Sequence, residues 1–299
     1  MEHIHSAAPI SSLIVALLIF TALIYLRGWL RIRSLGVEMI AGWRATSFLA
    51  GLFCIGIAVA SPVAALDHEL LTAHMIQHLL LMTLTPAFLL LGAPFFTLSH
   101  GLPQTRVKSV AFATFRWSRV GRLGNLLGQP VFCWIASTAT LVAWHVPAFF
   151  TIGSQSEIWH VVEHASFFSA GLLFWWPVIR PWPSAAGWPR WSTVLYLFLA
   201  TLPCDILSGF LVFCDRVVYT MYLSAPQRFG ISALEDQQRA AALMWTCVTL
   251  IYLVAAAIVA VRLLSVGSAG ENEPMPAELP VTVAAHAGQQ IAGLPEYGE

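Results

Sequence analysis

Long apolar segments recur along this 299-residue chain, and they constrain its fold more than any other feature. A helix needs about 20 residues to cross the hydrocarbon core of a bilayer, where the backbone must satisfy its own hydrogen bonds. With 58% hydrophobic and 10% charged residues, the composition lies far outside the range of soluble globular domains. We therefore predict an all-α integral membrane protein with seven transmembrane helices, near residues 9–26, 45–66, 70–92, 130–151, 158–180, 191–214 and 238–263.

The basic residues indicate how the chain is oriented. If the N-terminus faces outside, twelve of the fifteen Lys and Arg residues fall on the inner side and three on the outer side. An excess of basic residues in the loops is typical of the cytoplasmic side. We therefore expect the N-terminus outside and the C-terminus inside. The first apolar segment lacks a preceding basic region and is followed by Arg27, Arg31 and Arg33, which is unlike a cleavable signal.

The predicted membrane domain covers residues 1–264. Residues 265–299 are rich in Gly, Pro, Ala and Glu without apolar periodicity, which predicts a disordered cytoplasmic tail. Residues 101–129 mix basic and aromatic side chains, so they form either a helix on the inner membrane surface or a plain connector. The acidic and basic residues cancel, which argues against nucleic acid as a partner.

Two pairs of histidines occur at helical spacing inside apolar segments. Residues four apart share one helix face, so each pair presents two imidazoles in the same direction. At 1.5 Å per residue, the histidines of the third, fourth and fifth spans lie about 3–12 Å below the outer surface. Ionisable residues inside spans are costly, and several at one depth favour a shared metal site. The predicted metal ligands are His74, His78, His145, His160 and His164.

Other side chains could support such a site. Imidazole and thioether ligands suit copper, whereas imidazole alone also suits zinc, iron or nickel, and carboxylates can fix a histidine tautomer. The possible supporting residues are Met82, Glu163, Asp205, Asp236 and Met244. Simpler readings remain open: an intramembrane histidine can bond a neighbouring helix, methionine fills irregular cores, and Asp205 can cap backbone groups freed by Pro203.

The five cysteines form no C-x-x-C motif, and they are expected to be small apolar packing residues. Cys204 and Cys247 are predicted at similar depth, about 13–15 Å from the outer face, where they could join a soft Cu(I) site.

Four motifs occur in order between residues 67 and 250. They are His74-x-x-x-His78 with Gly92-x-Pro94, Trp144-His145-x-Pro147, His160-x-x-Glu163-His164 with Trp175-Trp176-Pro177, and Asp236-Gln237 with Met244-Trp245. Together they resemble the signatures of the CtaG-type cytochrome c oxidase assembly proteins, a multi-span family involved in Caa-type oxidase maturation. The resemblance implies a multi-pass protein of the bacterial inner (cytoplasmic) membrane that helps to mature a haem–copper oxidase and contacts its subunits.

The function that we predict is a membrane-embedded assembly factor, rather than an enzyme, that binds copper from the outside and delivers it to an oxidase subunit. Three alternatives compete. In an intramembrane zinc hydrolase, Glu163 or Asp205 would be the general base beside a zinc-activated water. Histidines on two helices could instead clamp a haem iron axially. The protein could also be a metal-free scaffold for oxidase assembly.

Overall fold

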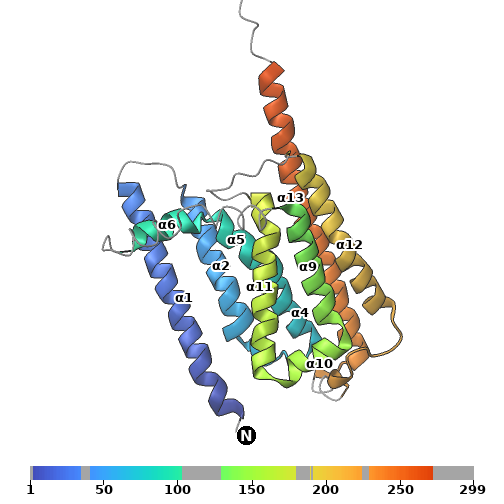
Figure 1. Ribbon diagram of the computed structural model, residues 1–299. Coiled ribbons are helices and arrows are strands. Elements are labelled where there is room, and N and C mark those ends of the chain that lie inside the picture. Colours follow the sequence, from blue (N-terminus) through green and yellow to red (C-terminus); the bar gives the residue numbers. More distant parts are fainter. Residues whose placement is uncertain are drawn as a thin grey trace, which may run out of the picture. The chain divides into compact units, whose positions relative to one another are not determined.

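The computed structural model describes residues 3–34, 41–102, 129–179, 189, 191–223 and 229–271, with side chains only between residues 12 and 265. Every regular element in these ranges is helical (Figure 1). The predicted inner-surface segment and most of the predicted tail lie outside the described residues. The elements are α1 (His3–Ser34), α2 (Gly42–Ala60), α3 (Pro62–Ala65), α4 (Leu71–Leu79), η1 (Leu80–Leu84), α5 (Thr85–Leu91), α6 (Pro94–Gly101), α9 (Pro130–His145), α10 (Pro147–Gln155), α11 (Glu157–Ile179), α12 (Trp191–Phe213), η2 (Thr220–Tyr222) and α13 (Ala233–Glu271).

Several of these segments are long and apolar enough to cross a membrane. There are five within the described part of the chain: Ser12–Ser34, Gly42–Ala65, Leu71–Leu91, Trp191–Phe213 and Ala233–Ser265. A sixth is added if the bent pair α9 and α10 forms one span. Helix α11 has 23 residues, but its two histidines and Glu163 interrupt its apolar sequence. The all-helical membrane fold is therefore confirmed, whereas the number of seven spans and the orientation of the termini stay predictions.

The predicted continuous span at 130–151 is wrong in one respect. The helix ends at His145, and α10 starts at Pro147 with a change of direction of 76°. Proline lacks a backbone N–H and disfavours helical geometry in the residue before it, and Val146 is accordingly extended, with φ −68° and ψ 126°. His145 therefore lies at the C-terminal end of α9 rather than within a continuous span.

The third predicted span lies at the centre of the membrane domain. In its apolar stretch 72% of the residues are buried, against 11 to 33% in the other four spans. The helix widens into a π-helical turn at η1, just before Pro86. Since Pro86 has no N–H to donate to the carbonyl four residues earlier, the carbonyl of Met82 loses its ordinary helical partner. Gly171 of α11 packs against this carbonyl, and a Cβ there would collide with it.

Helices α12 and α13 pack against the helices that carry the histidines. Their buried apolar side chains share one core with α4, α5, α10 and α11, and this core includes Phe174, Leu197 and Tyr252. The described residues up to Val259 form one compact unit, and a second unit begins at Ala260. In that second unit α13 continues to Glu271, and residues 272–299 lie outside the described part.

Candidate metal centre

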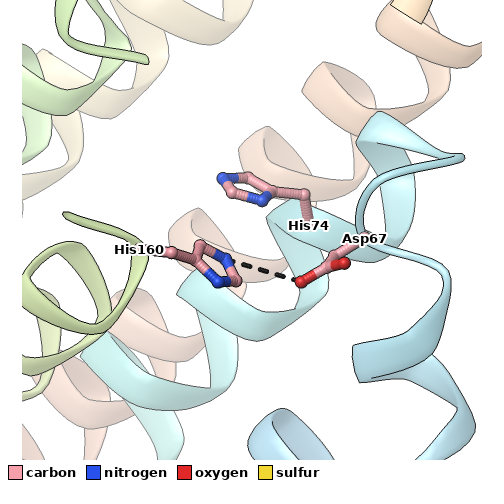
Figure 2. Close-up of side chains that lie close together, drawn as sticks. All are labelled: Asp67, His74 and His160. Carbon is pink, nitrogen blue, oxygen red and sulfur yellow. Dashed lines mark ion pairs between the residues drawn. The ribbon is translucent and has the colours of Figure 1, made fainter. Parts of the chain in front are cut away.

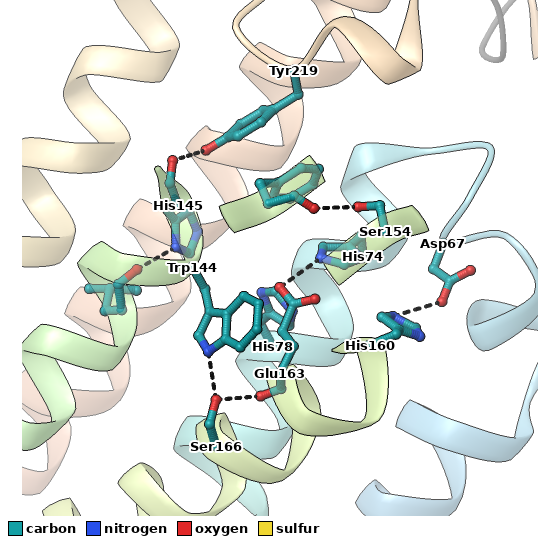
Figure 3. Close-up of polar contacts among 12 residues, drawn as sticks. Asp67, His74, His78, Trp144, His145, Ser154, His160, Glu163, Ser166 and Tyr219 are labelled. Atoms are coloured by element: carbon teal, nitrogen blue, oxygen red, sulfur yellow. Dashed lines mark hydrogen bonds and ion pairs between the residues drawn. The ribbon is translucent and has the colours of Figure 1, made fainter. Parts of the chain in front are cut away.

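Three buried side chains from α4 and α11 converge on one point. The i, i+4 spacing places His74 and His78 on the same face of α4, and α11 presents Glu163 to that face (Figure 3). Oε1 of Glu163 lies 3.5 Å from Nε2 of His74 and 3.3 Å from Nε2 of His78. One ligand atom from each residue lies within 4.8 Å of the other two. We call these residues the Glu163 triad.

A second group shares one histidine with the first. Oδ2 of Asp67 lies 3.4 Å from Nε2 of His160, and His74 completes the set within the same 4.8 Å limit (Figure 2). We call Asp67, His74 and His160 the Asp67 triad. Asp67 belongs to the turn between α3 and α4, yet its side chain is only 3% exposed. Its neighbour His68 is largely exposed.

Many ligand-capable atoms of this cluster are buried without a hydrogen-bond partner. The ion pairs given above join atoms 3.3–3.5 Å apart, but their geometry is not that of a hydrogen bond. The atoms without a partner among the described residues include Nε2 of His74, His78, His145, His160 and His164, Nδ1 of His78, Oδ1 of Asp67 and both carboxylate oxygens of Glu163. Such atoms are rare in folded proteins, and each costs about 1–3 kcal/mol. A bound cation would satisfy several of them together.

The charge of the cluster also favours a cation. No Lys or Arg in the described part of the chain forms an ion pair with Glu163 or Asp67. A buried carboxylate without a positive partner is strongly unfavourable. Within the cluster, a protonated imidazole or a metal ion would supply the positive charge. The donor set of imidazoles and carboxylates fits zinc or copper.

The two remaining predicted histidines lie beside the triads. The ring centroid of His164 is 4.2 Å from that of His160 and 5.7 Å from that of His78. The ring of His145 is 6.1 Å from that of His78. His145 Nδ1 donates to the carbonyl of Leu141 at 2.7 Å, which leaves Nε2 as its free ligand atom. The structure thus gathers all five predicted histidines, but only three of them belong to the triads.

Aromatic side chains from α10 and from the loop before α13 cover the cluster. The ring of Phe150 lies 5.1 Å from that of His74 and 4.2 Å from that of Tyr219. Tyr219 donates to the carbonyl of His145 at 3.0 Å, and Tyr222 donates to that of Asp67 at 2.6 Å (Figure 3 shows the Tyr219 contact). Burial raises the pKa of both phenols, so each hydroxyl keeps its proton and remains a donor.

The predicted supporting residues fall into four places. Glu163 lies between His74 and His78. The Asp236 carboxylate accepts hydrogen bonds from the first two amides of α4 and from the Thr72 hydroxyl, so it holds the start of that helix. Asp205 accepts a hydrogen bond from Thr249 of α13 at 2.9 Å.

Met82 and Met244 line a cavity beside His78. None of the five cysteines forms a disulfide, and Cys204 lines the same cavity.

Sequence reasoning missed Asp67, Tyr219 and Tyr222. Asp67 precedes His74 by seven residues, but it lies between two predicted spans, in the short polar turn Asp67-His68-Glu69. Nothing in the sequence pairs the two tyrosines with carbonyls more than seventy positions away.

Comparison with known proteins supplies a family and two distant relatives. A family model described as cytochrome c oxidase caa3 assembly factor matches residues 23–265. Uncharacterized proteins of Mycobacterium bovis and Mycobacterium tuberculosis are each 25% identical to the chain over 240 residues, which is 79% of this chain and 36% of the relative. The chain thus spans about a third of the length of these curated relatives. No solved structure matches it.

Proposed function

This chain belongs to the cytochrome c oxidase caa3 assembly factor family, and we propose that it binds copper at the histidine cluster and delivers it to a haem–copper oxidase subunit. The main support for the proposal is the Glu163 triad. Its three buried ligand atoms lie within 4.8 Å of one another, but their geometry is not that of hydrogen bonds. A bound cation would offset the free-energy cost of burying these polar atoms without hydrogen-bond partners. The family membership supports an assembly role rather than catalysis.

The arrangement of the ligands suits a cargo that must leave again. The two triads share His74, so a metal ion can move from one to the other while one ligand stays bound. His160 is 18% exposed, whereas His74 and His78 are 5% exposed or less. Copper would therefore enter at the Asp67 triad and move inward to the Glu163 triad. With the predicted orientation, this entrance faces the outer side of the inner membrane.

The first experiment is metal analysis of the detergent-purified full chain after loading with Cu(I) or Zn(II). Two variants remove the site in different ways: the double variant His74→Ala/His78→Ala and the isosteric Glu163→Gln. His100→Ala is the matched control, because His100 lies on α6 and contacts the Phe96 carbonyl. We expect the full copper content in the wild type and the control, and a lower copper content in both site variants. A copper content equal to that of the wild type in both site variants would refute the proposal.

A second candidate function is zinc-dependent hydrolysis within the membrane. The Glu163 triad is a two-histidine, one-carboxylate set, which is the ligand set of several catalytic zinc sites. Asp67 and His160 lie next to it and could exchange protons with a zinc-bound water. Zinc bound in preference to copper, together with cleavage of a lipid amide, would favour this function. If neither metal binds the wild type, a metal-free assembly scaffold remains.

A further inference from the structure

A narrow cavity is lined in part by His78, whereas neither Glu163 nor Asp67 lines it. Its volume is about 40 Å³, and residues of α4, η1, α9, α11, α12 and α13 line it. This space is larger than the roughly 10–15 Å³ that one buried water molecule needs. The lining side chains that could ligate a metal are Met75, Met82, Cys204 and Met244, with His78 and His145. Most of the other lining residues are apolar or aromatic, and no Asp, Glu, Lys or Arg is among them.

Most of the methionine side chains that the structure describes lie around this cavity. Only four methionines have described side chains, and three of them line the cavity; the fourth is Met221. Methionine commonly fills irregular gaps in apolar cores. Here, however, three methionines and a cysteine surround a space that they leave unfilled.

The two imidazoles supply a second, independent observation. Nε2 of His145 has no hydrogen-bond partner among the described residues, and its Nδ1 is fixed by Leu141, so the free lone pair is on Nε2. His145 is 5% exposed. His78 also has unpartnered nitrogen atoms, and it belongs both to the Glu163 triad and to the cavity lining. Buried nitrogen atoms without a partner are rare in folded proteins, and a metal ion would satisfy them.

We propose that this cavity is a second metal site, selective for Cu(I), in which thioethers and imidazoles are the ligands. Thioethers are soft and select Cu(I) over harder ions. Neutral ligands in an apolar cavity can compensate one positive charge better than two, which disfavours Zn(II) and Cu(II). The inference rests on the proposed copper handling and extends it, since His78 links the Glu163 triad to the cavity. Copper moves by exchange of ligands around His78 and stays Cu(I) throughout, so no electron or proton is transferred.

The test counts Cu(I) bound to the full chain under anaerobic, reducing conditions, by competition with a chromogenic Cu(I) chelator. X-ray absorption at the copper edge reports sulfur neighbours separately. The site variant is Met82→Leu/Met244→Leu, because leucine keeps the volume and removes the sulfur. Met221→Leu is the matched control, since Met221 does not line the cavity. Glu163→Gln, which leaves all the sulfur atoms in place, removes the triad site alone. Equal thermal unfolding of the variants shows that each is folded.

We expect the wild type and Met221→Leu to bind about two Cu(I) ions, one of them with sulfur neighbours. Met82→Leu/Met244→Leu should lose the sulfur-bound ion, and Glu163→Gln should lose the other. One copper without sulfur neighbours, unaffected by the methionine changes and lost in Glu163→Gln, would overturn this inference and leave the proposed function intact. Sulfur-bound copper that only the methionine changes abolish, with binding unaffected by Glu163→Gln, would support the cavity site and count against the triad.

Discussion

Replacement of Gly153 by alanine should damage the Glu163 triad without replacing any of its three residues. Gly153 lies in α10, and a Cβ built there would be 2.6 Å from Oε2 of Glu163 and 3.3 Å from Cζ3 of Trp144. A contact of 2.6 Å is too short, so the carboxylate must move. It has little room to do so, because Glu163 is fully buried.

The magnitudes make metal affinity the better measure of this change. Alanine gains about 1 kcal/mol over glycine in a helix, whereas overpacking costs about 1–3 kcal/mol. The net loss in the free energy of unfolding is then about 0–2 kcal/mol. Disturbing a residue that orients metal ligands typically weakens binding by about 10–100-fold. We expect a loss of copper affinity in this range, measured by chelator competition.

Gly56→Ala is the matched control for Gly153→Ala. Gly56 is also in a helix, but a Cβ there meets only a side-chain carbon of Leu18 at 3.8 Å, an ordinary contact. It should keep wild-type affinity and unfold at a similar or slightly higher temperature. If Gly153→Ala binds copper as tightly as the control does, the carboxylate of Glu163 does not contribute to the site.

Three further predictions concern the helices that position the cluster. Asp236→Ala leaves the first amides of α4 without their acceptor and should cost about 1–3 kcal/mol in thermal unfolding, with copper still bound at saturation; unchanged stability would contradict this. Gly171→Ala should cost about 1–3 kcal/mol through its clash with η1, whereas Gly209→Ala, which has a nearest contact of 3.8 Å, should not. Tyr222→Phe removes one hydrogen bond to the Asp67 carbonyl and should cost about 1 kcal/mol. It should also slow copper uptake in stopped-flow mixing; uptake at the wild-type rate would show that this contact does not position the entrance.

Much of the helical framework could be predicted from the sequence, because apolar length is a direct consequence of bilayer thickness. Helices α11 and α12 begin and end within about one residue of the predicted spans. The bend at Val146 was missed although Pro147 was visible, since proline within a span can either kink a helix or end it. The π-helical turn at η1 was not predicted, although Pro86, which follows it, is visible in the sequence.

Part of the candidate site could also be predicted, because helical spacing is a local property of the sequence. The spacing of His74 and His78, and of His160 and His164, fixes which imidazoles share a face, whichever helices pack together. Asp67 could not be predicted, because a turn residue is buried only by tertiary contacts such as that from Tyr222. Asp236 looked like a possible partner of a histidine, but the structure shows it at the N-terminus of α4, where its hydrogen bonds go to Leu71 and Thr72.

The most direct test of copper delivery is the copper-to-haem ratio of the haem–copper oxidase purified from cells whose own assembly factor is replaced by Glu163→Gln. Wild type and His100→Ala serve as controls, and equal membrane levels of the three proteins are checked by immunoblot. The account predicts an oxidase with its haem but depleted of copper in Glu163→Gln, and full copper in both controls. An oxidase with full copper in the Glu163→Gln cells would contradict the claim that the Glu163 triad delivers copper to it.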